Sequence, residues 1–246
     1  MAITIRIARG DTEDVFHIET KTKQTVLDAL FFIQNELDSS LSFRCSCRVG
    51  MCGSCGMIIN GREGLACRTS LNALGDDVSV QPLRHIPVIK DLVVDMEGFF
   101  SKYRAIEPYL SPRGDVTEPI IASPHSGIRK DIDLGLECIS CGLCLSACDV
   151  VGMVPDFLGP AALNRAYNLV ADVRDNRTDQ RLSIVGKLRV GVWQCHTQMS
   201  CVEVCPKNIA PTRGIVNLKR ILMRRSVFRH THRFTPKMQA IKMEVE

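Results

Sequence analysis

The sequence predicts an α+β fold of two domains, in which a small mixed sheet packed on one helix is followed by a helical domain. Its 246 residues exceed the usual size of one domain, so each half is expected to bury a core of its own. The N-terminal part alternates apolar and polar residues as strands do, whereas the second half repeats apolar residues at helical spacing. We therefore predict domains at residues 1–98 and 99–246.

The N-terminal domain begins with a predicted hairpin. Residues 4–8 and 15–19 alternate like strands and are separated by a polar turn. Residues 25–37 then have the spacing of an amphipathic helix, with Thr25 as its N-cap. A long cysteine-rich loop follows, and shorter strands are expected at residues 56–60 and 78–81.

Residues 82–137 are expected to connect the domains. They are rich in turn residues and contain one predicted helix, near residues 88–104. In the second half, one helix begins at Gly159-Pro160 and another covers residues 212–223. The apolar stripes of these two helices are more simply explained as core than as cofactor contacts; they consist of Leu163, Ala166, Tyr167, Val170 and Val173 in the first and Ile215, Leu218 and Leu222 in the second.

Twelve cysteines distinguish the chain from ordinary soluble proteins, although its apolar fraction of 45% and charged fraction of 24% are typical of them. They make up about 5% of the residues, which is below the roughly 8 to 10% of a disulfide scaffold. The N-terminus lacks the apolar segment of a secretory signal, and no run approaches the ~18 apolar residues of a membrane span. We therefore expect a reducing compartment and thiolates that bind metal.

The net charge of +4 is concentrated at the C-terminus, where residues 211–246 contain nine Lys or Arg and two Glu. A solvated basic tail explains this charge, and so does a surface for anionic lipid or an acidic partner. Three Tyr and one Trp offer few platforms for base stacking, and no groove-reading motif is present. We therefore expect no nucleic acid as a partner.

The stretch FRCSCRVGMCGSC contains four cysteines, and three of them fit a known iron-sulfur spacing. Cys47, Cys52 and Cys55, followed after eleven residues by Cys67, form the C-x4-C-x2-C…C pattern of a plant-type 2Fe-2S cluster. Cys45 does not fit this pattern. Glycines in the loop allow backbone N–H groups to face the cluster sulfurs. A structural zinc site is the alternative, but zinc ligands usually come as two C-x2-C pairs.

Two further cysteine groups follow one template. ECISCGLCLSAC has the C-x2-C-x2-C-x3-C spacing of bacterial two-cluster ferredoxins, in which the fourth cysteine binds the other cluster. CHTQMSCVEVCP has the same spacing, except that Gln198 takes the place of the second cysteine.

This crossover rule gives two ligand sets. The first set holds four thiolates for a 4Fe-4S cluster: Cys138, Cys141, Cys144 and Cys205. The second set holds only three: Cys148, Cys195 and Cys201. Because an amide is a poor iron ligand beside a thiolate, we expect this set to bind a 3Fe-4S cluster. A 4Fe-4S cluster completed by Gln198, water or hydroxide is the alternative.

These motifs, in this order, resemble those of the iron-sulfur subunit of the succinate dehydrogenase and fumarate reductase family. The likeness covers nearly the whole chain and includes SCRVGMCGSC with NGREGLAC, ECISCGLCLSAC, FLGPAALNRAY with DNRTDQRL, and CHTQMSCVEVCPKNIAPTRGI. It implies a plant-type 2Fe-2S ferredoxin-like domain of the β-grasp type, followed by an α-helical domain of the bacterial two-cluster ferredoxin type.

The resemblance also implies the electron-transfer subunit of a succinate:quinone oxidoreductase, the respiratory complex II of the tricarboxylic acid cycle. A separate flavoprotein subunit with covalent FAD would interconvert succinate and fumarate. Single electrons would pass through the 2Fe-2S, 4Fe-4S and 3Fe-4S clusters to quinone at a membrane-anchor subunit, with or without haem b. The chain has no dinucleotide fingerprint or nucleophile motif, so we predict no catalytic residue within it.

Some positions depart from the family pattern. Asp149 stands where relatives have proline, and Met153 where they often have tryptophan near the quinone. His196 matches a family histidine of the quinone and haem region, although a histidine beside a ligand is more often a local hydrogen-bonding partner. Cys45 replaces a common arginine. Its simpler interpretation is a small, half-buried residue without chemistry, and the other is a redox-sensitive thiol.

Three other classes of protein are alternatives to this subunit. A free ferredoxin-like carrier would have no complex, a subunit of another flavoprotein would usually keep a full cysteine set in the third motif, and a zinc protein would be colourless. The chain starts almost at its first strand, which leaves no room for an Arg- and Ser-rich transit peptide. This favours a peripheral protein on the cytoplasmic face of a prokaryotic inner membrane, although a processed organellar protein would look the same.

Overall fold

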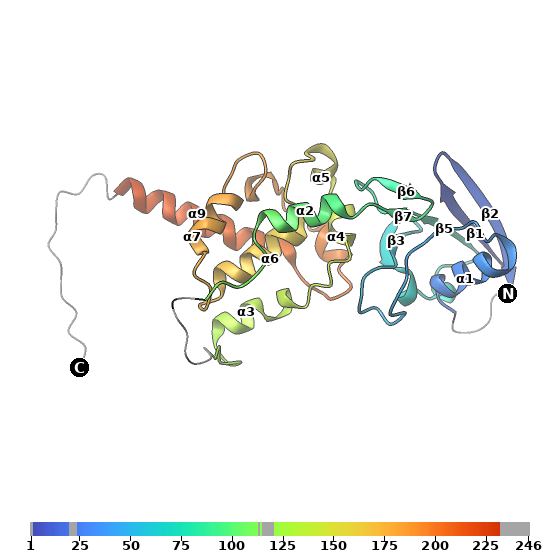
Figure 1. The fold of residues 1–246 in the computed structure, drawn as a ribbon, viewed down its shortest axis with the longest axis horizontal. Helices are drawn as coiled ribbons and strands as arrows, with labels where there is room; N and C mark the ends of the chain where they lie inside the picture. Colours follow the sequence, from blue (N-terminus) through green and yellow to red (C-terminus); the bar gives the residue numbers. More distant parts are fainter. Residues whose placement is uncertain (1, 20–23, 113, 115–120, 232–246) are drawn as a thin grey trace.

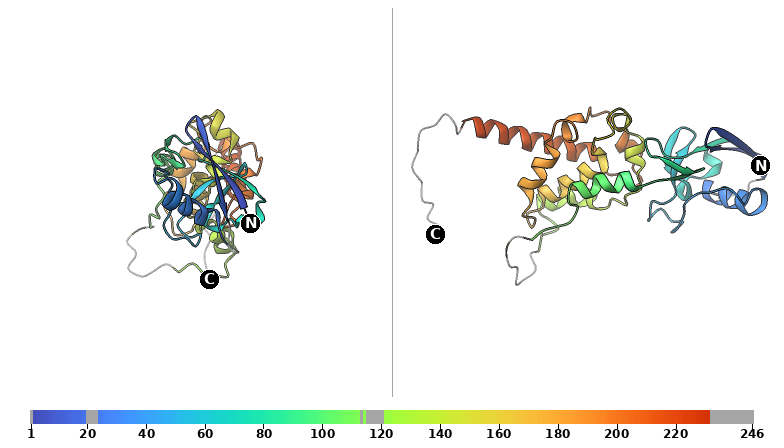
Figure 2. Two further views of the ribbon diagram at one scale, coloured as in Figure 1. Left: turned by 90° about the vertical axis from the view of Figure 1, so that its right-hand side faces the viewer. Right: turned by 45° about the horizontal axis from the view of Figure 1, so that its top comes forward.

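The computed structural model describes residues 2–19, 24–112, 114 and 121–231, which form a sheet domain and a helical domain arranged end to end (Figure 1). The molecule is therefore elongated; Figure 2 shows it along the long axis in the left view and with that axis horizontal in the right view. None of the described helices is both long and apolar enough to cross a membrane. Residues 232–246 of the predicted basic segment lie outside the described residues.

The N-terminal domain is built on a five-stranded mixed sheet with the order β2-β1-β5-β3-β4. Its strands are β1 (Ala2–Arg9), β2 (Thr12–Glu19), β3 (Gly56–Ile59), β4 (Arg62–Leu65) and β5 (Asp77–Gln81). The β1–β5 pair is parallel and the other pairs are antiparallel. Alternation along β1 buries Ile3, Ile5 and Ile7. The predicted strands and N-terminal hairpin are confirmed.

One helix packs against this sheet. The helix α1 (Val26–Phe32) begins at the predicted N-cap, where Thr25 and Asp28 form a capping box. The chain then continues as a π-helix, η1 (Ile33–Leu37), in which Asp38 N donates to the Ile33 carbonyl. The extent of the predicted helix is confirmed, but its last part is wider than an α-helix.

The prediction of a helix near residues 88–104 is wrong for the first half of that range. Two short strands, β6 (Val88–Lys90) and β7 (Val93–Val94), precede the helix α2 (Glu97–Ala105). The turn between the strands is fixed by Asp91, whose buried carboxylate accepts from Arg9 Nε at 3.0 Å and from Ser42 N at 2.8 Å. These tertiary contacts hold the segment extended although its local pattern favours a helix.

The C-terminal domain is helical, with α6 at its centre. Its helices are α3 (Gly127–Leu136), α4 (Leu143–Ser146), α5 (Asp149–Met153), α6 (Gly159–Ala171), α7 (Thr178–Val185), η4 (Val192–Gln194), α8 (Ser200–Glu203) and α9 (Pro211–Thr231). The helix α6 contacts α2, α3, α4, α7 and α9 and is buried on almost every side, as expected for a central helix. Pro160 occupies its first turn, as predicted.

Three details of this domain differ from the sequence prediction. The helix α3 was not expected, although Ser126 caps it by accepting from Arg129 N at 3.2 Å. The helix α6 ends before Val173, whose side chain is 52% exposed and does not belong to the core. The helix α9 is longer than predicted and extends beyond the rest of the domain (Figure 1).

Candidate iron-sulfur sites

The four cysteines predicted to bind a 2Fe-2S cluster lie in the loop after η1 and beside the β3–β4 hairpin. Cys47 Sγ accepts backbone hydrogen bonds from Met51 at 3.2 Å and from Cys52 at 3.3 Å. Burial, together with the charges of Cys67 and Cys52, raises the pKa of Cys55 to about 12. These interactions connect the four thiols, which the structure therefore brings together.

The backbone of this loop is left-handed at three positions. Arg48, Gly50 and Gly53 have φ angles of 58°, 76° and 73°, in the left-handed region. The strain is about 1 to 3 kcal/mol for a residue with a side chain, such as Arg48, and much less for glycine. Such strain is expected where a loop is shaped by its ligand rather than by its own sequence.

Cys52 differs from its neighbours because it is exposed. The Ser54 hydroxyl lies 3.1 Å from Cys52 Sγ and is the main cause that lowers the pKa of Cys52 to about 6. The site therefore contains a hydroxyl donor that stabilises the thiolate form of one ligand.

Two separate cavities in the helical domain are lined by the other predicted ligands. Four cysteines line the first cavity: Cys138, Cys141, Cys144 and Cys205. Three cysteines line the second cavity: Cys148, Cys195 and Cys201. Each cavity thus receives cysteines from both motifs, in the combination that the crossover rule predicts. Within the described chain, no three His, Cys, Asp or Glu side chains converge as ligands of a single metal ion.

The two ligand loops of the helical domain repeat one backbone conformation. Ser140 and Gly142 have φ angles of 54° and 80°, and they flank Cys141. Thr197 and Met199 have φ angles of 63° and 69°, and they flank Gln198. A short helix follows each loop, α4 in the first case and α8 in the second. Gln198 therefore occupies the place in its loop that Cys141 occupies in the other.

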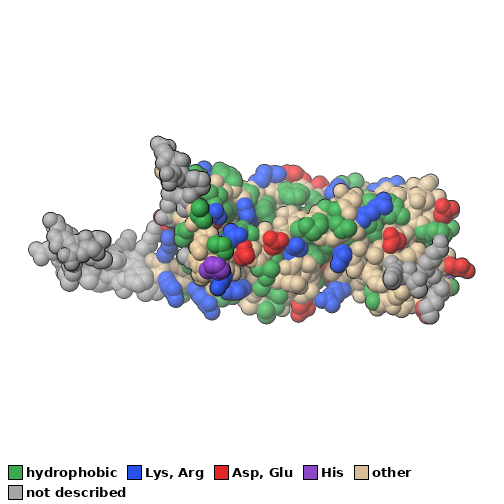
Figure 3. All heavy atoms as spheres, turned by 90° about the horizontal axis from the view of Figure 1, so that it is seen from below, with side chains coloured by type: hydrophobic (Ala, Val, Ile, Leu, Met, Phe, Trp, Pro, Cys, Tyr) green, Lys and Arg blue, Asp and Glu red, His purple; other side chains and the backbone are tan. Residues whose placement is uncertain are grey.

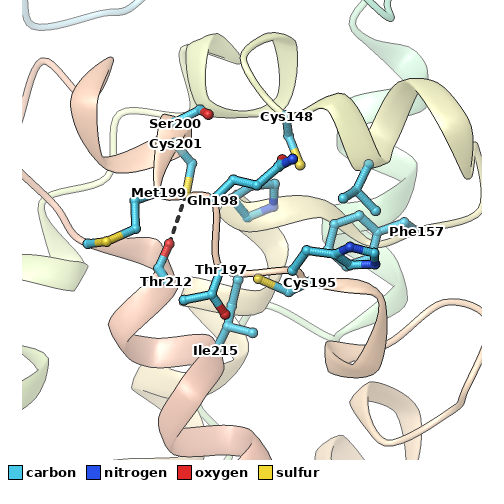
Figure 4. Close-up of a pocket in the computed structure, with 13 residues that line it drawn as sticks. Cys148, Phe157, Cys195, Thr197, Gln198, Met199, Ser200, Cys201, Thr212 and Ile215 are labelled. Carbon is cyan, nitrogen blue, oxygen red and sulfur yellow. Dashed lines mark hydrogen bonds between the residues drawn. The ribbon is translucent and has the colours of Figure 1, made fainter.

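The side chain of Gln198 lines the second cavity and points into it, on the side of Cys148 (Figure 4). Cys148 approaches from the N-cap of α5, Cys195 from the loop that follows η4, and Cys201 from α8. The cavity thus has three thiols and an amide where the first cavity has four thiols.

The raised pKa values of these thiols are consistent with sites that bind a positively charged group. Burial raises the pKa of Cys141 to about 11, raises that of Cys144 well above its ordinary value, and also raises those of Cys148 and Cys201. The charges of neighbouring cysteines contribute in the same direction. Thiolates so arranged repel one another and need positive charge between them, which iron supplies. All twelve cysteines are free thiols, so none is held in a disulfide.

Three hydroxyl groups beside these sulfurs were not predicted. Tyr103 Oη donates to Cys138 Sγ at 3.5 Å, and Thr212 Oγ1 lies 3.3 Å from Cys201 Sγ, as Figure 4 shows. Ser54 is the third. Ser54 could have been found from the sequence, because it lies between two predicted ligands. Tyr103 in α2 and Thr212 in α9 could not, because only tertiary packing brings them to the sulfurs.

Three further residues that the sequence analysis named differ in their surroundings. His196 is exposed and lines the second cavity beside Cys195. Met153 is 68% exposed at the end of α5. Cys45 is half-buried and packs against the hydrophobic core, and it lines neither of the two cysteine cavities.

Comparisons with known proteins give the same organisation. Residues 4–101 match the family described as "2Fe-2S iron-sulfur cluster binding domain", and residues 135–209 match the family described as "4Fe-4S dicluster domain". The mitochondrial succinate dehydrogenase (ubiquinone) iron-sulfur subunit of Dictyostelium discoideum is 41% identical over 207 residues, covering 80% of this chain and 71% of that protein.

Two further relatives agree. The succinate dehydrogenase iron-sulfur subunit of Paracoccus denitrificans is 39% identical over 204 residues, covering 82% of this chain and 78% of that protein. A chain of the solved Mycobacterium smegmatis Sdh1 complex in the apo form has a TM-score of 0.82 at 28% identity, covering 92% of this chain and 97% of that one. The protein described here therefore belongs to the family of succinate dehydrogenase iron-sulfur subunits.

Proposed function

We propose that the chain relays single electrons through three clusters between a flavoprotein subunit with FAD and a quinone at a membrane anchor. The observation that supports this most is the order of the cysteine sets along the molecule. The 2Fe-2S loop packs against Cys141 of the first cavity, and the charge of Cys201 in the second cavity reaches Cys144 in the first. A continuous series of three sites is what an electron relay requires.

The proposed ligands follow the three sets. The 2Fe-2S cluster takes Cys47, Cys52, Cys55 and Cys67; the 4Fe-4S cluster takes Cys138, Cys141, Cys144 and Cys205; the 3Fe-4S cluster takes Cys148, Cys195 and Cys201. Bound clusters supply the one-electron chemistry. The chain itself holds the sulfurs in place and directs N–H and O–H groups at them, which offsets their negative charge.

The proposed domain boundary lies between residues 98 and 99. The strands β6 and β7 complete the N-terminal part, whereas α2 begins at Glu97 and packs on α6 of the helical domain. The boundary thus falls within the first turn of α2.

Two regions of the surface suit different partners. Val49 and Met51, in the 2Fe-2S loop, are 60% and 61% exposed and offer an apolar surface to the flavoprotein. In the helical domain, Leu188 is 74% exposed, and Met199, which lines the second cavity, is 49% exposed. On the face shown in Figure 3, Lys and Arg side chains gather on the part of the helical domain that is farthest from the sheet domain. We assign the helical domain to the membrane anchor, with His196 facing the quinone and haem region.

The location follows from these partners. The chain would be a peripheral subunit on the cytoplasmic side of a prokaryotic inner membrane. Exposed cations near α9, among them Arg220 and Arg224, suit the negative surface of that leaflet.

Low-temperature EPR of the complex isolated from its native membrane tests the proposed function. Succinate should reduce the 2Fe-2S cluster and convert the three-iron signal to its reduced, silent state, and added quinone should reverse both changes. A free carrier would instead elute from a sizing column as a monomer of about the chain mass of 27.4 kDa and would not respond to succinate.

A further inference from the structure

We propose that Gly53 is a positioning residue that holds the 2Fe-2S loop in direct contact with Cys141, and that this contact is the electron route between the first two clusters. The proposal rests on the proposed function. In the step concerned, one electron leaves the first cluster and enters the second. No bond is formed or broken and no proton moves.

Gly53 lies between two ligands of the first cluster, Cys52 and Cys55, and its backbone is buried. A Cβ atom at this position would lie 2.6 Å from Cys141 Cβ and 2.9 Å from Cys141 Cα. It would also lie 3.2 Å from the Ile139 carbonyl oxygen. Because backbone atoms cannot rotate aside, any side chain at position 53 must move the two loops apart.

A second glycine makes a similar approach. A Cβ atom at Gly56 would lie 3.1 Å from the Cys141 carbonyl oxygen and 3.2 Å from Leu143 Cδ2. Two backbone segments that flank Cys55 therefore both reach the same ligand of the second cluster. Residues of both loops, including Cys52 and Cys141, also line one cavity beside this contact.

The domains are locked together close to this contact. Glu63 in β4 is 6% exposed and accepts from Ser146 Oγ at 2.9 Å and from the Arg84 guanidinium at 2.6 Å. Ser146 Oγ is fully buried in α4 and accepts from Arg84 N at 2.9 Å. Arg62 donates to the Glu203 carbonyl at 2.9 Å. This lock opposes a rigid-body shift of the domains, so a side chain at position 53 would distort the ligand loops themselves.

Gly75 provides a matched control outside the ligand loops. Its φ of 83° is left-handed, as is the 73° of Gly53, so replacement by alanine imposes a comparable backbone strain. A Cβ atom at Gly75 would meet nothing within 4 Å beyond its chain neighbours. Neither Cys141 nor the ligand loops are therefore affected.

The test compares Gly53→Ala, Gly75→Ala and the unchanged protein, each in the assembled complex. EPR and iron analysis first establish that both clusters are present. Two quantities are then measured: the rate at which succinate reduces the second cluster in freeze-quenched samples, and the faster spin relaxation that the reduced second cluster causes in the first. Gly53→Ala should slow the transfer several-fold and weaken the relaxation effect, and Gly75→Ala should change neither.

The outcomes separate the two proposals. A Gly53→Ala protein with both clusters, unchanged transfer rate and unchanged spin relaxation would overturn the role of Gly53. If this variant loses the first cluster, Gly56→Ala replaces it, because Gly56 has no left-handed backbone to strain. Unchanged rate and relaxation in Gly56→Ala would then overturn the contact. A wild-type complex whose clusters are not reduced by succinate would instead contradict the proposed function.

Discussion

At the scale of single residues, hydroxyl groups beside the sulfurs are one means by which this chain adjusts its clusters. Each donor stabilises negative charge on a thiolate, and it does so more strongly in the reduced cluster, which carries the extra electron. Ser54, Tyr103 and Thr212 provide one hydroxyl near each of the three sites. Removal of such a hydroxyl should therefore make its cluster harder to reduce.

Tyr103→Phe should lower the midpoint potential of the 4Fe-4S cluster. The phenyl ring keeps the packing on Phe99, whereas the hydrogen bond to Cys138 is lost. A hydrogen bond to a charged group contributes about 1.5 to 3 kcal/mol, and part of that differs between the two redox states, so the shift should be on the order of tens of millivolts. Potentiometric EPR measures it. Tyr109→Phe, which loses a hydroxyl beside Arg177 instead, should leave the potential unchanged.

Cys45→Ser should retain the 2Fe-2S spectrum, and Cys47→Ser should alter or abolish it. Cys47 Sγ accepts two backbone hydrogen bonds within the loop, whereas Cys45 packs against the core. Circular dichroism in the visible range distinguishes the two variants. Loss of the spectrum in Cys45→Ser, with the protein still folded, would show that Cys45 is the ligand.

At the scale of helices and strands, the segment between the domains is fixed by side chains rather than by regular structure. Arg181 in α7 is fully buried and forms an ion pair with Asp175, which is also fully buried. Arg181 also donates to the carbonyls of Glu107 at 3.0 Å and Tyr109 at 2.6 Å. One arginine thus attaches the residues after α2 to the helical domain.

Arg181→Ala should destabilise the protein by about 3 to 5 kcal/mol, because it removes the positive charge of Arg181 from beside the fully buried Asp175 carboxylate. Arg104→Ala serves as the control, since Arg104 and its partner Glu97 are 61% and 67% exposed and such pairs contribute at most about 1 kcal/mol. Thermal unfolding of samples with equal iron content measures both. Equal midpoints for the two variants would show that the buried pair does not hold the connector.

An element could be predicted from the sequence where the residues that determine it are close together in the chain. The start of α1 was predictable because its capping box involves Thr25 and Asp28, which are neighbours in sequence. The strands β6 and β7 were not, because Asp91 is held by Arg9 and Ser42 from distant parts of the chain. The π-helix η1 was also missed, since apolar periodicity does not distinguish it from an α-helix.

At the scale of the whole molecule, a sheet domain that contains one set of cysteines is followed along the long axis by a helical domain that contains two (Figure 1). The cysteines that line the two cavities of the helical domain were predictable, because residues of one ligand loop keep a fixed spacing and the crossover rule exchanges the last cysteine of each motif. The contact of Gly53 with Cys141 was not predictable, because it depends on how one domain docks on the other.

The third cysteine set tests the account most directly, since the place of Gln198 decides which cluster it binds. Low-temperature EPR of the oxidised complex should show a three-iron signal in the unchanged protein. In Gln198→Cys a fourth thiolate should convert this cluster to 4Fe-4S, and the oxidised signal should disappear, whereas Gln198→Ser should keep it. An oxidised three-iron signal that persists in Gln198→Cys, or that is absent from the unchanged protein, would contradict the account.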